Sequence, residues 1–153
     1  MARLSKILSG VSGEYFVAAE LSRRGYIASI TLRNSRGIDL LCAAEGGERA
    51  VRIQVKTNQG SRPKWMLSRK AESHADTDLF YVFVCLNGLE GSPAYHIVES
   101  AVVAAHCRES HAEWLSQPKA DGTPRKDTSM RIFEDSAGEY LGAWERLGLE
   151  DDR

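Results

Sequence analysis

The longest unbroken apolar run in the chain extends from Leu79 to Leu86 (LFYVFVCL) and has eight residues. A run of this length, rich in β-branched and aromatic residues, is typical of a strand that is buried on both faces. It is too short for a membrane-spanning helix, which needs about 20 apolar residues. A strand of this kind needs layers of structure on both sides. We therefore expect an α/β fold in which helices flank a central mixed β-sheet.

Hydrophobic periodicity and turn residues predict the other elements. Ser12 is the expected N-cap of the first helix, because its hydroxyl can accept from a free N–H of the first turn. The chain has the length of one domain, with a core over about 10–115 and a C-terminal helix docked on it. The predicted elements are a helix from about Gly10 or Ser12 to Arg24, strands at 26–32, 38–43, 50–57, 94–98 and 130–133, helices at 99–115 and 136–148, a turn at 34–37, a basic loop at 58–69 and a polar loop at 116–129.

The composition is that of a soluble globular protein, with 42% hydrophobic and 27% charged residues. The N-terminus lacks the apolar stretch of a secretory signal, and three cysteines without a CxxC pair argue against a disulfide framework. We expect a cytoplasmic protein without a membrane segment.

The charge is split along the chain. Residues 1–70 hold 13 Lys or Arg against 5 Asp or Glu, and residues 71–153 hold 7 against 16. This split favours an anionic partner for the basic half.

Asp39 is unusual because it lies within the apolar segment IDLLC. A buried aspartate is costly unless a partner satisfies it. The turn 45–49 predicts a hairpin that pairs strand 38–43 with strand 50–57, so that Asp39 lies opposite about residue 55, beside Gln54 and Lys56. One interpretation is a plain ion pair between Asp39 and Lys56. The other is a chemical site.

The chemical interpretation adds Glu14 from the packed first helix. Two carboxylates and an amide oxygen are hard ligands suited to Mg²⁺, and a nearby lysine can position a water. These are the parts needed for metal-assisted attack on a phosphate. Glu20 is the rival carboxylate on the same helix, but it faces another direction and we favour Glu14.

These residues resemble the PD-(D/E)xK nuclease superfamily, which includes many restriction enzymes and archaeal Holliday-junction resolvases. The similarity covers about residues 10–60 and rests on Glu14 in GEYFVAAELSRRGY, Asp39 in GIDLLC, and Gln54 and Lys56 in IQVKT. It implies a restriction endonuclease-like core with an approximate α-β-β-β-α-β order. It also implies that Asp39, Gln54 and the Val55 carbonyl hold Mg²⁺, or Mn²⁺, with support from Glu14, while Lys56 assists the attacking water.

Two residues depart from the family pattern. Ile38 precedes Asp39 where proline is common, and Gln54 stands where Asp or Glu is usual. A glutamine oxygen can ligate a metal but brings no negative charge, so metal affinity should be lower. Some methyl-directed restriction nucleases resemble this chain in using Gln-x-Lys at the same place.

Basic residues surround the predicted site and could contact the phosphates of DNA. Trp65 in the basic loop could stack on a base, although packing on the sheet is the favoured interpretation. A zinc site at the histidines is not expected, because four ligands at defined spacings are lacking. The candidate nucleic-acid-binding residues are Arg33, Arg36, Arg62, Lys64, Arg69 and Lys70.

The sequence thus predicts a Mg²⁺-dependent endonuclease that hydrolyses DNA phosphodiester bonds. The alternative is a catalytically inactive nuclease fold that serves as a nucleic-acid-binding or regulatory module, with Gln54 as a mark of lost activity. The C-terminal half could also form the face of a homodimer, and no sequence feature decides this.

Overall fold

The computed structural model describes residues 3–32 and 37–149 of the chain. Two helices, seven strands and two short 3-10 helices lie within these ranges. The elements are α1 (Lys6–Arg23), β1 (Tyr26–Ile30), β2 (Leu40–Ala44), β3 (Ala50–Asn58), β4 (Lys64–Ser68), η1 (Arg69–Glu72), β5 (Leu79–Cys85), β6 (Ala94–Glu99), α2 (Ser100–Ser116), β7 (Met130–Glu134) and η2 (Trp144–Leu147).

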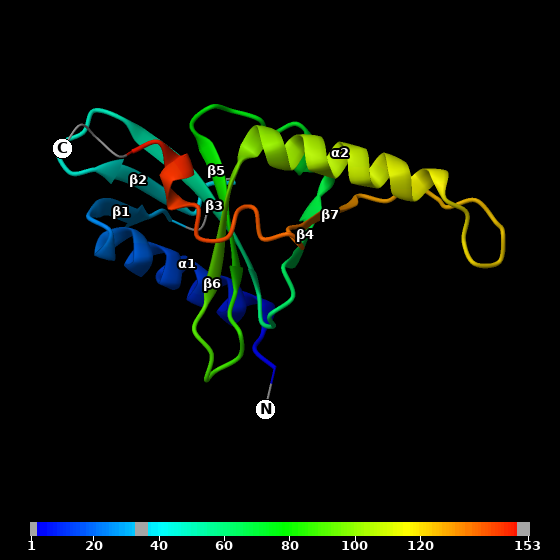
Figure 1. Cartoon of the computed structure of the whole chain (residues 1–153), viewed down its shortest axis with the longest axis horizontal. Helices are drawn as coiled ribbons and strands as arrows, with labels where there is room; N and C mark the ends of the chain where they lie inside the picture. The colour runs from blue at the N-terminus through cyan, green and yellow to red at the C-terminus, as the bar shows by residue number, and fades with distance from the viewer. Residues whose placement is uncertain (1–2, 33–36, 150–153) are drawn as a thin grey trace.

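Five strands form a mixed sheet in the order β1-β2-β3-β5-β6. Only the pairing of β3 with β5 is parallel within this sheet, and the other neighbours are antiparallel. A second, two-stranded sheet joins β4 to β7. Figure 1 shows α1 and α2 on opposite sides of the large sheet, with α2 extending well beyond it. The expected α/β class, with a mixed sheet flanked by helices, is confirmed.

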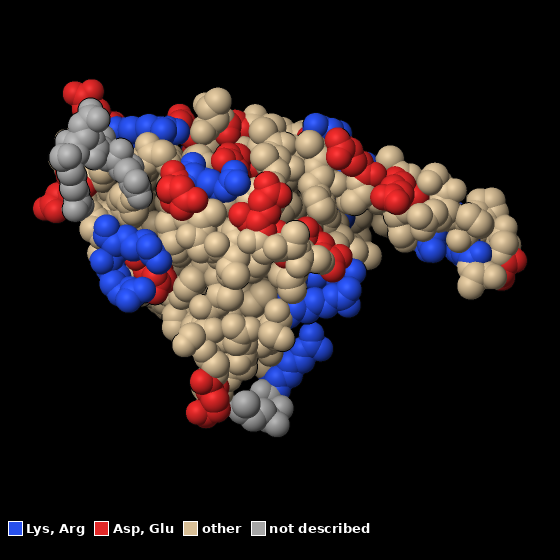
Figure 2. Space-filling model, in the orientation of Figure 1, with Lys and Arg blue, Asp and Glu red and all other residues tan. Residues whose placement is uncertain are grey.

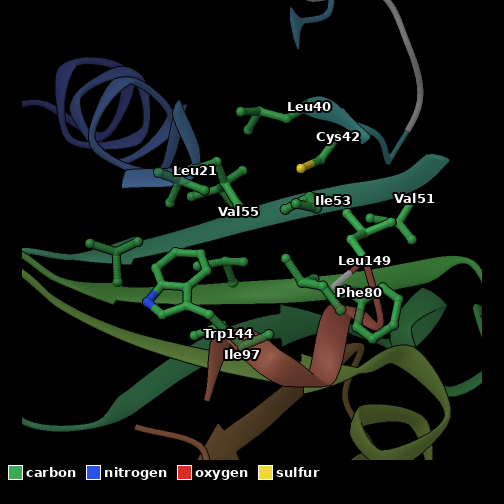
Figure 3. Close-up of a cluster of buried hydrophobic side chains, with 14 of the residues drawn as sticks. Leu21, Leu40, Cys42, Val51, Ile53, Val55, Phe80, Ile97, Trp144 and Leu149 are labelled. Atoms are coloured by element: carbon green, nitrogen blue, oxygen red, sulfur yellow. The ribbon is translucent and has the colours of Figure 1, made fainter. Parts of the chain in front are cut away.

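Strand β5 is buried along its whole length and contributes to two separate hydrophobic cores. Phe80, Val82 and Val84 belong to the core beneath α1, which also contains Trp144 of η2 (Figure 3). The alternate residues of β5 belong to the core formed with β4, β7 and α2. Because successive strand residues point to opposite faces, one apolar run supplies both cores. The prediction of a two-sided buried strand is correct.

Helix α1 begins earlier than expected. Its N-cap is Ser5, whose Oγ accepts from the Leu8 N–H at 3.2 Å. The expected cap, Ser12, lies inside the helix, where its hydroxyl donates to the Leu8 carbonyl at 2.7 Å. A serine can satisfy its hydroxyl in this way within a helix, so the residue type alone did not identify the boundary.

The basic loop expected at 58–69 contains strand β4. Trp65 and Leu67 alternate with exposed residues and pack into the second core, because β4 pairs with the distant strand β7. The loop expected at 116–129 contains no strand or α-helix beyond Ser116, the last residue of α2 (Ser100–Ser116), and Figure 1 shows it at the far end of this helix. The turn expected at 34–37 falls outside the described residues, apart from Gly37.

The prediction of a helix at 136–148 is wrong. The segment is irregular until the 3-10 helix η2, and Gly138 and Gly142 adopt positive φ angles of 70° and 66°. Beside short turn hydrogen bonds, its backbone bonds to β6, since the Ile97 N–H donates to the Tyr140 carbonyl and the Gly142 N–H to the Tyr95 carbonyl. Trp144 is buried in the first core, as predicted.

No helix among the described residues has the length and apolar character needed to cross a membrane.

The contact of Gly13 with β3 sets how closely α1 packs on the sheet. A Cβ at Gly13 would lie 1.8 Å from Thr57 Oγ1, whereas a Cβ at Gly10 would meet no atom within 4 Å. Gly13→Ala should therefore lower the free energy of unfolding by about 1–3 kcal/mol through overpacking. Gly10→Ala is the matched control and should raise it by up to about 1 kcal/mol through helix propensity. Urea unfolding measures both changes, and equal effects would contradict this packing.

Candidate functional site

Asp39 lies where β2 meets the middle of β3. Its backbone N–H donates to the Ile53 carbonyl at 2.8 Å, and its carboxylate Oδ2 accepts from the Val55 N–H at 2.7 Å. These two bonds span Gln54, so the carboxylate is held beside that residue. The Leu40–Ile53 register places Asp39 opposite Gln54, one residue from the predicted position. Ala44 has no partner in β3 but stays in β2, where it pairs with Tyr26 of β1.

The carbonyl of Val55 shares the edge of β3 that bears Asp39. The Arg52 N–H donates to the Asp78 carbonyl, so the even-numbered residues of β3 direct their backbone toward β5. Val55 has the opposite parity, and its N–H reaches Asp39. Since the N–H and C=O of one strand residue point to the same side, the Val55 carbonyl also faces the Asp39 side. The carbonyl and the carboxylate therefore lie at one place in the sheet.

Gln54 is on the polar face of β3, beside Tyr81 of β5. Its Oε1 atom is buried and has no hydrogen-bond partner within the described part of the chain. A buried acceptor without a partner is costly, and native proteins seldom leave one. An external group such as a cation or a substrate donor would relieve this cost. The oxygens of Asp39, Gln54 and Val55 are hard donors and fit Mg²⁺ in chemical type.

The oxygen donors of Asp39, Gln54 and Val55 include only one charged group, the Asp39 carboxylate. Among the described residues, no group of three or more His, Cys, Asp or Glu side chains is arranged to hold a metal ion. Asp39 is therefore the one carboxylate that the hydrogen bonds described above bring to Gln54. The lower metal affinity expected from an amide at position 54 stays a prediction.

Lys56 lies two residues after Gln54 and lines the same hollow. This hollow has a volume of about 740 Å³, and its floor contains Leu67 and Tyr81. The positive charge of Lys56 acts on the carboxylate of Asp39. Burial raises the pKa of Tyr81 to about 12, so its phenol stays protonated at neutral pH. The other described residues that line the hollow are Gly37, Ser68, Lys70, Ala71 and His74.

Glu14 lies on α1, directly after Gly13, which packs on Thr57. Helix α1 covers the face of the sheet opposite the hollow, because its residues Val17 and Leu21 belong to the first core. Glu14 is therefore near β3 but approaches it from the other face. Glu20, the rival carboxylate, forms ion pairs with Arg23 at 3.1 Å and Arg24 at 3.4 Å.

The carboxylate of Asp39 is in an environment that opposes its charge. Burial raises its pKa above the ordinary value of 3.8. The hydrogen bond from the Val55 N–H and the charge of Lys56 act in the opposite direction but do not cancel the effect. A perturbed carboxylate beside an unpaired amide oxygen makes this place a candidate functional site.

The basic residues predicted to bind nucleic acid have different surroundings. Arg62 and Lys64 lie 3.5 Å and 4.0 Å from oxygens of Glu134, and Arg69 lies 3.1 Å from Asp127. On the face shown in Figure 2, Lys and Arg side chains form no continuous basic surface. Lys70 lines the hollow and has no ion pair with a described residue. Arg33 and Arg36 fall outside the described residues.

Trp65 packs on the sheet, as the favoured interpretation predicted. Its ring centroid lies 4.9 Å from that of Phe83, and its Nε1–H donates to the Val84 carbonyl at 3.0 Å. With 3% of its surface exposed, Trp65 has no face left for stacking on a base.

Sequence reasoning missed His74 and Tyr81 as residues of the hollow. The apolar run around Tyr81 hid its position, and no local pattern singled out His74.

The chain was compared with known proteins at three levels. No family model and no curated protein sequence matches it. Among solved structures, it is similar to a bacterial homing endonuclease, I-Ssp6803I, with a TM-score of 0.56 and 14% sequence identity. The superposition covers 94% of this chain and 91% of the endonuclease chain. At this identity the likeness is one of fold, and it shows that the chain has a nuclease-like fold.

Asp39→Asn should raise the melting temperature near neutral pH, because burial makes the native carboxylate costly. The pKa of Asp39 is higher in the folded than in the unfolded state, so the penalty is present above the folded pKa and fades as the pH falls through it. The gain should shrink in acid, where the native residue is itself protonated. Thermal unfolding at about pH 7 and about pH 4 measures this difference.

Asp76→Asn is the matched control for charge removal. A backbone bond from Asp78 and the side chain of Arg52 hold the pKa of Asp76 below its usual value. The two aspartate variants should therefore change the melting temperature in opposite directions at neutral pH. Destabilisation by Asp39→Asn would contradict the electrostatics described here.

Proposed function

We propose that this protein is a metal-dependent nuclease that hydrolyses phosphodiester bonds of DNA at the hollow beside β3. The observation that carries the proposal is the buried, unpartnered Gln54 Oε1 next to the Asp39 carboxylate. Two residues later, Lys56 lines the same hollow. The nuclease-like fold supports this assignment, as does the resemblance of these residues to the PD-(D/E)xK superfamily.

The residues that would hold Mg²⁺ or Mn²⁺ are Asp39, Gln54 and Val55 through its carbonyl. Glu14 is added on the family resemblance alone. A bound divalent ion would offset the charge of the phosphate and lower the pKa of a water. The Val55 N–H occupies one oxygen of Asp39, which orients the carboxylate and leaves its second oxygen for the ion.

Lys56 would orient the attacking water. The backbone of Lys56 belongs to a strand and not to a loop, because residue 56 pairs with Phe83 in the parallel register. The alternation of β3 puts Lys56 on the same face as Gln54, so both side chains reach the hollow. Positioning of this kind on a rigid element is what attack at phosphorus needs.

DNA would bind through phosphate contacts around the hollow. Lys70 lines the hollow, and Arg62, Lys64 and Arg69 lie on the neighbouring strand and turn. The ion pairs of these three residues are exposed or partly exposed, and pairs at the surface contribute about 0–1 kcal/mol each. A phosphate could therefore replace Glu134 or Asp127 at little cost. Binding of this type weakens steeply with salt.

A nucleic-acid-binding or regulatory module without catalysis is the second candidate function. It is favoured by the low charge of the donor set, in which an amide replaces the usual second carboxylate. In this case DNA binding would depend on salt but not on chelators. The cleavage experiment below separates the two functions.

Lys56→Gln and Asp39→Asn should each slow nicking of supercoiled plasmid in Mg²⁺ or Mn²⁺ by about 10²-fold or more, because water positioning and metal binding are lost. A chelator should abolish the activity of the unmodified protein. Lys119→Gln, in the exposed loop beyond α2, is the control. Unchanged cleavage by the two site variants would refute this assignment. Salt-sensitive binding without cleavage would support the second candidate.

Gln54→Glu should tighten Mg²⁺ binding, because a second carboxylate adds charge to the ligand set. Gln54→Ala should weaken it by removing the amide oxygen. Calorimetric titration of Mg²⁺ and Mn²⁺ into the three proteins measures the order of affinities. If Gln54→Ala binds metal as well as the unmodified protein, Gln54 is no ligand.

A further inference from the structure

Two hollows on the surface meet at His74. The larger hollow contains Gln54 and Lys56, and a smaller one of about 270 Å³ contains Arg52 and Asp76. Both are lined by Gly37 and His74. Because glycine has no side chain, His74 contributes the side chain that the two hollows share among the described residues.

His74 approaches the larger hollow from a different wall than Lys56. It follows η1 in the chain, and its backbone N–H donates to the Lys70 carbonyl at 3.2 Å. The residue is exposed, and its ring lies 3.8 Å from the position that a Cβ on Gly37 would take. The imidazole is thus accessible at the junction, whereas Lys56 projects from the sheet.

The segment that carries His74 is held at both ends by buried groups. Ser100 is fully buried; its hydroxyl donates to the Asp76 carbonyl at 2.8 Å and accepts from the Asp76 N–H at 2.9 Å. Arg131, with 4% of its surface exposed, donates to the carboxylate of Glu72. Such support limits the movement of a side chain that must act at a defined place.

We propose that His74 is the general acid that donates a proton to the leaving oxygen. The inference rests on the proposed nuclease function. The leaving oxygen joins the scissile phosphorus to the next nucleotide, so its proton donor would have to stand where the strand leaves the larger hollow, which in this proposal is the junction with the smaller one. His74 occupies that junction. An imidazolium is suited to this role because its ring N–H groups can donate a proton to an oxygen within hydrogen-bond reach.

The water oxygen forms a bond to phosphorus while the bond from phosphorus to the leaving oxygen breaks. The water gives up one proton to solvent, and the leaving oxygen takes one from the His74 imidazolium. Solvent then reprotonates the imidazole, so His74 returns to the protonation state in which the step began.

The test compares two substrates that differ in their leaving groups. Supercoiled plasmid has an alkoxide leaving group that needs a proton, whereas bis(4-nitrophenyl) phosphate releases a nitrophenolate that does not. With His74→Gln in Mg²⁺ or Mn²⁺, the plasmid rate should fall about 10²-fold further than the ester rate. Lys56→Gln should slow both substrates to the same extent, because the attacking water is common to them.

His111→Gln is the matched control. His111 lies on α2 and pairs with Asp127 at 2.7 Å, outside both hollows, so its loss should leave both rates unchanged. Equal slowing of the two substrates by His74→Gln, or no slowing, would overturn the assignment while the nuclease function stands. Failure of the unmodified protein to hydrolyse either substrate would overturn both proposals. Thermal unfolding of each variant verifies that it is folded.

Discussion

The parallel pairing of β3 with β5 is the contact on which the rest of the structure depends. Because β5 is buried on both faces, it requires α1 and η2 on one side and β4, β7 and α2 on the other. Strand β3 shares only the first of these cores, through Val51, Ile53 and Val55. Its opposite face lies where the cover from β4 and η1 is incomplete. Polar side chains can occur in the middle of the sheet only at such a place, and Gln54 and Lys56 are there.

Two groups of the candidate site lower the stability of the folded protein. Gln54 Oε1 is buried without a partner, and burial opposes the charge of Asp39. A sequence selected for stability alone would replace both groups by apolar or paired residues. Natural chains depart from local consistency mainly at functional sites, where a ligand supplies the missing interaction. The cores around β5 provide the stability that allows this departure.

Sequence reasoning succeeded where neighbouring segments interact and failed where distant ones do. Alternation in β3 and the short turn before it placed Asp39 within one residue of its true partner. Strand β4 was missed because its partner, β7, is far along the chain. The segment before η2 had helical spacing, but its backbone bonds to β6, which local propensity cannot reveal. His74 was missed for the same reason, since only the tertiary fold brings it to the hollow of Lys56.

The split of charge along the sequence does not become a split between two faces. The acidic half folds back on the basic half, so that Glu134 faces Arg62 and Lys64, and Asp127 faces Arg69. Within the described residues, Lys56 and Lys70 remain outside such ion pairs, and both line the hollow. The hollow therefore holds two lysines that the acidic half does not pair, although other lysines without ion pairs, such as Lys6 and Lys119, lie elsewhere among the described residues. If DNA binds as proposed, its phosphates would exchange with these carboxylates, so that binding would depend on contact geometry as well as on net charge.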